Sequence, residues 1–233
     1  MDKLSVIVPM LNEEGAIARP LDAIAAGAPQ AQVIVVDGAS TDRSRDHARA
    51  RCALLLVAQR GLARQMNAGA AAAKGDALAF VHADTIVPPT FADDIAAALA
   101  DPAVVGGRFD VELDDASAML RLVGRLISAR SRLSRTATGD QAIFIRRRVF
   151  ELLGGYRDIE LGEDLDLARR MKRAGAVACL RTRVTTSARR WREHGIVATS
   201  VRMWFLRAAL LLGVPPSRLA RLYKRGGRAE NDG

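Results

Sequence analysis

The sequence predicts an α/β protein in which a mainly parallel central sheet is flanked by helices, with a helical extension at the C-terminus. In residues 1–101, short runs rich in Val, Ile and Leu alternate with helical segments. Such alternation favours parallel strands joined by right-handed crossovers. In addition, 49% of the 233 residues are hydrophobic, which is ample for the core of a domain of this size.

Four strand–helix units account for the first half of the chain. The expected strands are 4–9, 33–37, 53–58 and 77–82, and the expected helices are 15–27, 41–51, 62–74 and 88–100. Ser40 or Thr41 is expected to cap the second helix. The sequence contains neither G-x-G-x-x-G after the first strand nor G-x-x-x-x-G-K-[ST], which argues against a dinucleotide-binding Rossmann domain and against a P-loop enzyme.

The pattern becomes mixed after residue 102. Strands are expected at 103–113, 140–145 and 176–180, and helices at 116–133, with basic residues on its exposed side, and at 162–174. A nearly apolar segment, 196–214, contains Arg202 and Arg207. Because each central Arg costs about 2.5–3.5 kcal/mol in a membrane span, we expect this helix to pack on the domain or to lie in a membrane interface. A short basic helix is expected at 219–224.

The positive charge is concentrated near the C-terminus. The net charge is +9, and residues 181–233 contain 12 basic and 3 acidic residues, whereas residues 1–180 contain 23 of each. This asymmetry indicates an anionic partner or, equally, a solvated basic tail. Aromatic residues make up only 4% of the chain, which argues against base stacking on aromatic side chains. Cys52 and Cys179 fit no metal or redox spacing and are expected to be buried thiols in a reducing compartment.

The strongest candidate for a site is the end of the fourth strand, where the run ALAF is followed by Val81 and then by His82, Ala83 and Asp84. Polar side chains at the carboxyl end of a buried parallel strand lie where α/β proteins bind ligands. On an extended strand His82 and Asp84 would project to the same side. A carboxylate beside a second ligand could hold Mg²⁺ or Mn²⁺ on a diphosphate, although Asp84 could equally be an ordinary helix cap.

Two other strand ends carry polar groups at the same expected edge. The first strand is followed by Asn12, Glu13 and Glu14, and the second ends at Asp37. Capping alone explains three such strand ends poorly, although it remains the simpler explanation for at least two of Ser40, Thr41 and Asp42. Arg60 and Arg64, at the start of the third helix, could meet a phosphate or could simply be surface charges.

Together these stretches resemble the family-2 glycosyltransferases of the GT-A fold. The matching stretches, in order, are VIVPMLNEE, VVDGASTD, RGLARQMNAGAAAAKGD, FVHADT, GDQ at 139–141 and LGED at 161–164. The resemblance covers residues 3–195. Through HADT, GDQ and SARRW the chain is most similar to a small bacterial subgroup, the radical-SAM-associated or arsenosugar-biosynthesis glycosyltransferases.

The resemblance implies roles for particular residues. The nucleotide and donor site would contain Pro9, Asn12, Glu13, Glu14, Asp37, Arg60, Arg64, His82, Ala83 and Asp84, with Asp37 on the base, usually uracil. Asp84 matches the last carboxylate of the Asp-x-Asp metal motif, whose first position is His82 here, and His194 is a candidate second ligand for Mg²⁺ or Mn²⁺. Asp164, preceded by Glu163, matches the catalytic base of inverting members. Donor sugar or acceptor contacts would come from Gly139, Asp140, Gln141, Arg190 and Trp191.

The resulting expectation is a metal-dependent inverting glycosyltransferase. The transferase domain would span 1–195, with a nucleotide-binding half at 1–101 and an acceptor half at 102–195, followed by a basic amphipathic extension at 196–233. Its expected partners are a nucleotide-diphosphate sugar, in the first place a UDP-sugar, a small or lipid-linked acceptor, and a membrane surface reached through 196–233, but no nucleic acid. The expected location is the cytoplasm, including the inner membrane face.

Two other functions fit parts of the pattern. A sugar-phosphate nucleotidyltransferase would show a Gly-rich loop with Arg or Lys after the first strand, and residues 11–15 do not. A non-catalytic basic adaptor for membranes or nucleic acid would not need Asp84, Asp140 and Asp164 together.

Overall fold

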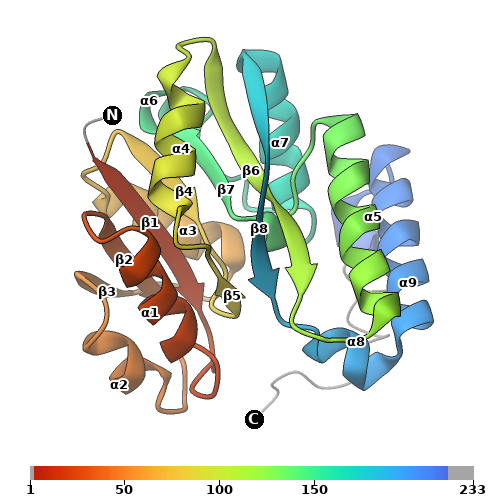
Figure 1. The fold of residues 1–233 in the computed structure, drawn as a ribbon, viewed down its shortest axis with the longest axis horizontal. Coiled ribbons are helices and arrows are strands. Elements are labelled where there is room, and N and C mark those ends of the chain that lie inside the picture. Colours follow the sequence, from red (N-terminus) through yellow and green to blue (C-terminus); the bar gives the residue numbers. More distant parts are fainter. Residues whose placement is uncertain (1–2, 220–233) are drawn as a thin grey trace.

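The computed structural model of the protein describes residues 3–219, and in this part of the chain an eight-stranded mixed sheet runs through the centre (Figure 1). The strand order is β3-β2-β1-β4-β7-β6-β8-β5. The strands are β1 (Leu4–Met10), β2 (Gln32–Asp37), β3 (Leu54–Val57), β4 (Ala77–Phe80), β5 (Thr85–Ile86), β6 (Val104–Leu113), β7 (Ile143–Arg146) and β8 (Ala176–Thr186).

The first half of the sheet is parallel, as predicted. β1 lies between β2 and β4, with Val6 opposite Val33 on one side and opposite Ala79 on the other, and β3 pairs with the far side of β2. All four strands therefore direct their carboxyl ends to one edge. The second half is mixed, because β7 pairs antiparallel with both β4 and β6, whereas β6 and β8 are parallel.

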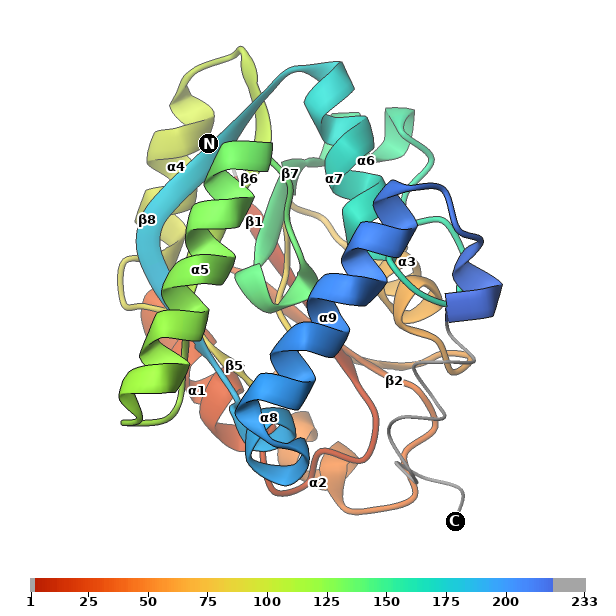
Figure 2. The same cartoon turned by 90° about the vertical axis from the view of Figure 1, so that its right-hand side faces the viewer.

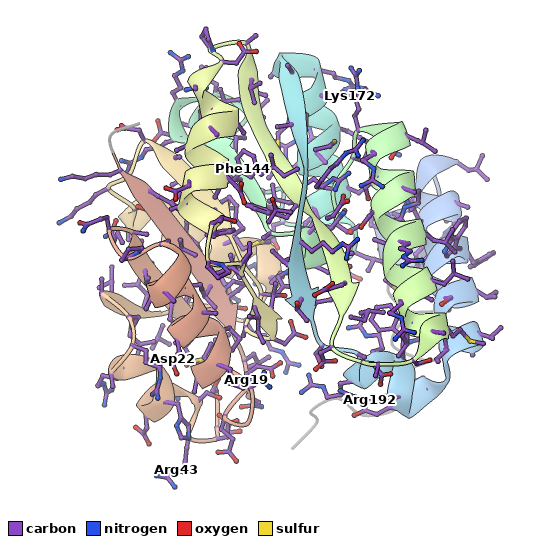
Figure 3. The ribbon with its side chains drawn as sticks, in the orientation of Figure 1. Arg19, Asp22, Arg43, Phe144, Lys172 and Arg192 are labelled. Atoms are coloured by element: carbon purple, nitrogen blue, oxygen red, sulfur yellow. The ribbon has the colours of Figure 1, made fainter. Side chains whose placement is uncertain are left out.

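Helices cover both faces of the sheet, because the strand residues alternate between two apolar cores. Val6 and Val8 belong to one core with residues of α1, α4 and α5, whereas Ile7 belongs to the other with residues of α3, α6 and α7. In Figure 3 the ring of Phe144 lies within the central layer, whereas the labelled charged side chains, such as Arg43 and Lys172, lie at the periphery. The two cores fix the sheet and leave its carboxyl edge to the loops.

The helices agree with the expected positions in most of the chain. They are α1 (Ala18–Gly27), α2 (Ser44–Arg49), α3 (Leu62–Ala72), α4 (Phe91–Ala100), α5 (Ala118–Ser134), α6 (Arg147–Leu152), α7 (Glu163–Ala174), α8 (Arg189–His194) and α9 (Ile196–Leu211), with a short 3₁₀ helix η1 (Gly139–Gln141). The expected helix 41–51 shrinks to α2, which has no side-chain cap. Neither α6 nor α8 was expected, and residues 139–141 form η1 rather than the start of a strand.

The fourth strand was predicted too long. It ends at Phe80, and residues 82–85 form a turn in which the Thr85 backbone N–H donates to the His82 carbonyl at 3.0 Å. His82 and Asp84 therefore do not alternate along a strand as expected. The turn is stabilised by β5, which follows at once and pairs with the end of β8. β8 itself extends to Thr186, well beyond the expected 176–180.

Apart from Ile196, which packs against the first core, the described residues of helix α9 lie outside both cores. Figure 2 shows it crossing in front of the sheet beside α5 and α7, and Leu206, Ala209 and Leu219 form a small separate apolar cluster with Leu161 and Leu210. In the part of the chain that the structure describes, no helix is both long and apolar enough to cross a membrane. The expected helix 219–224 lies outside the described residues, except for Leu219.

The expectation for the cysteines was partly wrong. Cys52 and Cys179 are both free thiols, but both are only half-buried. Desolvation nevertheless raises the pKa of Cys52 above its ordinary value. A thiol with a raised pKa is less nucleophilic at neutral pH, which agrees with a packing role for this residue.

Candidate active site

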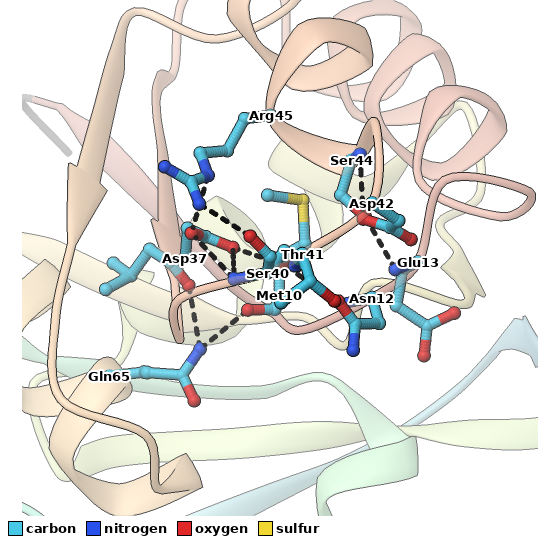
Figure 4. Close-up of polar contacts among 11 residues, drawn as sticks. Met10, Asn12, Glu13, Asp37, Ser40, Thr41, Asp42, Ser44, Arg45 and Gln65 are labelled. Carbon is cyan, nitrogen blue, oxygen red and sulfur yellow. Dashed lines mark hydrogen bonds and ion pairs between the residues drawn. The ribbon is translucent and has the colours of Figure 1, made fainter. Parts of the chain in front are cut away.

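The loops after β1 and β2 are joined by hydrogen bonds into one unit at the carboxyl edge of the sheet (Figure 4). The Asn12 backbone N–H donates to Ser40 Oγ at 2.9 Å, and the Thr41 N–H donates to Asn12 Oδ1 at 2.9 Å. The Glu13 N–H donates to Ser44 Oγ at 2.7 Å. The polar residues at 40–44 thus tie two loops together instead of capping a helix.

Both loops contain a residue in the left-handed region. Asn12 has φ 51° and Ala39 has φ 71°. Asn tolerates this conformation, but Ala does not favour it, and such strain persists where the surroundings hold the backbone in place. The loops are therefore held in a fixed shape at the carboxyl edge of the sheet.

Asp37 is the centre of this unit. Its carboxylate is fully buried, accepts hydrogen bonds from the backbone N–H and the hydroxyl of Ser40, and forms an ion pair with Arg45 at 3.1 Å. A carboxylate offers about four acceptor positions, and these partners occupy most of them. In this structure Asp37 therefore positions the β2 loop. A nucleobase could bind to Asp37 only through the acceptor positions of the carboxylate that these partners leave open.

Gln65 was not singled out by the sequence, although it lies within the motif at 60–69. Its side-chain amide is buried and donates to the carbonyls of Met10 and Val36, both at 2.9 Å. It thereby fixes the ends of β1 and β2 from α3 (Figure 4). The sequence signal that could have revealed this role is a polar side chain at a core-facing position of an otherwise apolar helix.

Asp84 stands beside these loops, immediately after β4. Its side chain is half-exposed, and its Oδ1 accepts from Thr85 Oγ1 at a long 3.4 Å. Between residues 3 and 219 no three His, Cys, Asp or Glu side chains form a group able to hold a metal ion. Mg²⁺ and similar ions are commonly held by one or two carboxylates plus substrate phosphates, so Asp84 fits such a site without a complete protein cage.

A second group of polar side chains lies next to Asp84, around η1. A Cβ atom on Gly139 would collide with both His82 Nε2 and Asp164 Oδ2, so these two atoms lie close together on either side of that glycine. His82 Nε2, Asp140 Oδ1 and Asp164 Oδ1 are all sealed from solvent and make no hydrogen bond with any described residue. Buried polar atoms of this kind are normally paired, so this group has the character of a ligand-binding centre.

The environment of Asp164 shifts its titration. Burial raises the pKa of its carboxyl well above the ordinary value, the charges of Glu163 and Asp140 raise it further, and the Gly139 backbone N–H offsets part of the effect. The pKa of Glu163 is also raised, by burial first, with His82 acting in the opposite direction. Desolvation of the buried carboxyl therefore outweighs the stabilisation that a helix N-terminus gives to an ionised carboxylate.

Other predicted site residues have structural partners. Gln141 is fully buried, accepts from Ser131 Oγ at 2.8 Å and donates to the Phe109 carbonyl, so it braces η1. Arg64 forms an ion pair with Asp158 at 2.8 Å, and Arg60 is exposed. Trp191 lies in an apolar core.

The segment at 189–194 contacts the β1 loop through Arg189 and the residues after β6 through Arg192. Arg189 reaches Glu13 at 3.3 Å, which ties α8 to the nucleotide-side loops, and Arg190 is half-buried. His194 is exposed in the last turn of α8. Pro9 and Ala83 are buried, and the Glu14 carboxylate accepts from the Arg43 N–H at 2.9 Å.

The family described as "Glycosyl transferase family 2" matches residues 5–151, which is more than half of the chain. The chain belongs to glycosyl transferase family 2. The matched region runs from β1 to α6 and includes both loops, Asp84 and η1. None of the curated proteins compared with it matches.

Solved structures of glycosyltransferases share the fold of this family 2 chain. A mannosyltransferase from Pyrobaculum calidifontis, in complex with GDP-Man and Mn²⁺, is 25% identical with a TM-score of 0.61; the match covers 79% of this chain and 56% of that one. S. aureus TarS in complex with UDP-GlcNAc is 19% identical with a TM-score of 0.64, covering 79% and 58%. Glucosyl-3-phosphoglycerate synthase from Mycobacterium tuberculosis, with Mn²⁺ and UDP, is 21% identical with a TM-score of 0.63, covering 92% and 81%.

These matches establish the GT-A fold for the family 2 chain. The chain spans little more than half the length of the first two proteins.

Proposed function

We propose that the protein is a metal-dependent, inverting glycosyltransferase that moves a sugar from a nucleoside-diphosphate donor, a UDP-sugar, to an acceptor hydroxyl. The observation that carries the proposal is the buried carboxylate of Asp164, which lies against Gly139 and His82 beside the strand edge that bears Asp84. Membership of glycosyl transferase family 2 supports the reaction class. We also propose that the protein belongs with the radical-SAM-associated subgroup of this family and that it is located in the cytoplasm.

In this proposal, different groups of residues along the edge of the sheet have different roles. The braced loops of β1 and β2 hold the nucleotide, and Asp84 holds the metal ion on the diphosphate. When bound, such an ion neutralises the charge that develops on the leaving diphosphate. The bond from the anomeric carbon to the phosphate oxygen breaks as the bond to the acceptor oxygen forms. Asp164 takes the proton from the acceptor hydroxyl, and its raised pKa makes it a stronger base than an ordinary carboxylate.

The two other functions are less consistent with this arrangement. An adaptor gains nothing from carboxylate oxygens that are buried without a hydrogen bond, such as Asp140 Oδ1 and Asp164 Oδ1, since such atoms reduce stability. In a nucleotidyltransferase the attacking group is a phosphate, which needs no general base. The positions of Asp164 and Glu163 therefore favour transfer to a hydroxyl. In this proposal Glu163 acts with Asp164 as a coupled pair, and His82 belongs with that pair rather than with the metal ion.

Calorimetric binding of UDP, GDP and NAD, each with and without Mn²⁺, tests the nucleotide site. We expect UDP to bind, and to bind more tightly when Mn²⁺ is present, because Asp84 would supply a carboxylate ligand for an ion that neutralises the diphosphate. NAD should not bind, since the chain has no dinucleotide-binding motif. If no nucleoside diphosphate binds in the presence of Mn²⁺, the transferase proposal is wrong.

We also propose that the protein contacts an anionic membrane surface through an apolar face formed by α5 and α9. Large apolar side chains are exposed along this face, among them Trp204 at 51% and Phe205 at 59% exposure. The others are Met119, Leu122, Leu126 and Leu133 of α5 and Val197 and Val201 of α9. Exposed Arg121 and Arg125 stand among them on α5, and apolar side chains interspersed with Arg are typical of helices that lie in a membrane interface.

Replacing Val201 and Phe205 together with Ser should weaken partition onto anionic vesicles by about 10-fold or more, since each buried apolar side chain contributes about 1.5–3 kcal/mol. Vesicle sedimentation of the full chain measures this. The control is Leu152→Ser, which removes an even more exposed apolar side chain from α6. If the wild type stays in the supernatant, or if both variants sediment as it does, this face does not bind membranes.

A further inference from the structure

Three arginines from three helices converge beside the proposed catalytic carboxylates. Arg130 comes from α5, Arg169 from α7 and Arg207 from α9. All three are half-buried. Arg207 of α9 donates to Thr136 Oγ1, just beyond the end of α5 that carries Arg130. Desolvation first, and then the charges of Arg130 and Arg169, lower the pKa of Arg207 to about 10. Burial and the charge of Arg108 also lower the pKa of Arg130.

The charge of this cluster is not balanced by the protein. Asp140 is the carboxylate that acts on both Arg130 and Arg207, and neither arginine forms an ion pair with it. The nearby carboxylate of Asp110 is already shared by Arg108 and Arg132, which both form ion pairs with it. Within residues 3–219 none of the three arginines therefore forms an ion pair with a carboxylate.

The side chains also have donor capacity left over. The Nε atom of Arg130 is sealed from solvent and makes no hydrogen bond with a described residue. Arg207 donates one hydrogen bond, to Thr136 Oγ1. A guanidinium has five N–H donors in a rigid fork that matches phosphate oxygens, and desolvated guanidiniums left without such partners lower stability. A phosphate would supply both the missing negative charge and the missing acceptors.

The position of the cluster separates it from the diphosphate of the donor. In the sheet order, the nucleotide-side loops follow β1 and β2, Asp84 follows β4, and η1 precedes β7 on the far side of β4. Asp140, whose charge acts on Arg130 and Arg207, belongs to η1, next to Gly139 and Asp164. The arginines are thus on the side of the catalytic base, where the acceptor must present its hydroxyl.

We propose that Arg130, Arg169 and Arg207 bind a phosphate group of the acceptor, so that the enzyme glycosylates a phosphorylated alcohol rather than a neutral one. This inference rests on the proposed transferase function and specifies its acceptor. The phosphate can belong to a small soluble molecule or to a lipid. Arg130 also lines a surface groove of about 510 Å³ with Leu126, Leu133 and Trp204, so a lipid phosphate could reach the cluster from the apolar face.

Inorganic phosphate is the first probe, because its binding does not depend on knowing the acceptor. Phosphate should raise the unfolding temperature of the full chain above that in chloride of equal ionic strength, and titration of the shift measures the affinity. Arg207→Gln and Arg169→Gln should each weaken that affinity about 10-fold or more, since hydrogen bonds to charged groups are the strong ones. Arg173→Gln, an exposed position one turn further along α7, is the matched control.

The variants should fold, because each one removes a charge from a group of like charges. Their affinity for UDP with Mn²⁺ should stay at the wild-type value. If phosphate stabilises the wild type no more than chloride, or if the variants lose UDP affinity as much as phosphate affinity, the cluster is not an acceptor site. Absence of UDP binding in the wild type would instead refute the transferase function, and the phosphate titration would still report on the cluster.

Transfer assays then separate the two sources of phosphate. Release of UDP from a UDP-sugar is measured with glycerol, with glycerol 3-phosphate, and with vesicles of phosphatidic acid or phosphatidylcholine. Faster release with glycerol 3-phosphate than with glycerol indicates a soluble acceptor, and faster release with phosphatidic acid indicates a lipid one. If neutral glycerol is used as well as its phosphate ester, the proposal is wrong.

Discussion

Replacement of Asp164 by Asn is expected to lower the rate of sugar transfer by about 10²- to 10⁴-fold, the usual contribution of a general base. Asn has nearly the same shape as Asp but cannot accept the proton of the acceptor hydroxyl. The affinity for UDP with Mn²⁺ should change little, because Asp164 lies beside η1 and not in the nucleotide-side loops. Steady-state transfer kinetics and calorimetry of the same preparation measure the two quantities.

The same substitution should make the protein more stable at neutral pH. The pKa of Asp164 is raised in the folded state, chiefly by burial, so folding disfavours the ionised carboxylate. Its contribution to stability is fully present below the ordinary pKa of 3.8 and is lost as the pH rises through the folded-state pKa. The gain in unfolding temperature from Asp164→Asn should therefore be largest at neutral pH and should vanish in acid.

Asp166→Asn is a suitable control for both readouts. Asp166 lies in the same first turn of α7, but it forms ion pairs with Arg170 at 2.7 Å and with Arg157 at 3.2 Å. Its removal should leave the transfer rate intact and lower stability by about 0–1 kcal/mol. If Asp164→Asn retained full activity, or lowered stability as Asp166→Asn does, Asp164 would be a helix-start residue and not the base.

The pH dependence of transfer follows from the same shift. The base must be ionised to act, so kcat/KM should rise with pH through an apparent pKa above 3.8, the ordinary value for Asp. Because Glu163 and Asp164 titrate together, this apparent value belongs to the pair.

The sequence was a good guide wherever local pattern decides structure. In β1 and β2 the alternation of residues such as Val6 and Ile7 serves both cores, so the apolar runs marked the strands correctly. The predictions were wrong where partners distant in the sequence determine the local structure. Ser40 or Thr41 was expected to cap a helix, but the Ser40 hydroxyl accepts from the Asn12 backbone N–H and the Thr41 N–H donates to the Asn12 side chain, across the sheet edge. β8 continues through alternating polar residues because β6 and β5 pair with it.

In the candidate site, too, the sequence indicated what depends on local motifs and missed what depends on partners distant in the chain. The strand-end motifs correctly placed Asp37 and Asp84 at one edge, since parallel strands deliver their carboxyl ends together. Gln141 looked like a substrate contact but is a buried brace, because its partners Ser131 and Phe109 come from elements distant in the chain. The arginine cluster could not be read from the sequence, because it forms only when α5, α7 and α9 pack together.

Replacement of Asp84 by Asn should lower kcat/KM about 100-fold or more, since a metal ion that polarises a phosphoryl oxygen contributes several kcal/mol in the transition state. Asn keeps one neutral oxygen but loses the negative charge that a divalent ion requires. Asp84 is half-exposed and its one contact, with Thr85 Oγ1, is long. The fold should therefore be unaffected, and the loss should appear as weaker enhancement of UDP binding by Mn²⁺.

Asp93→Asn, an exposed substitution in the first turn of α4, controls for the loss of one negative charge from the protein. Chelation of the metal should reduce the wild type to the level of Asp84→Asn and should leave that variant almost unchanged, because both remove the same interaction. If Mn²⁺ enhanced UDP binding equally in Asp84→Asn and in the wild type, the metal would be held elsewhere. The exposed His194 would then be the next residue to test, because the resemblance assigns a late His to the metal site.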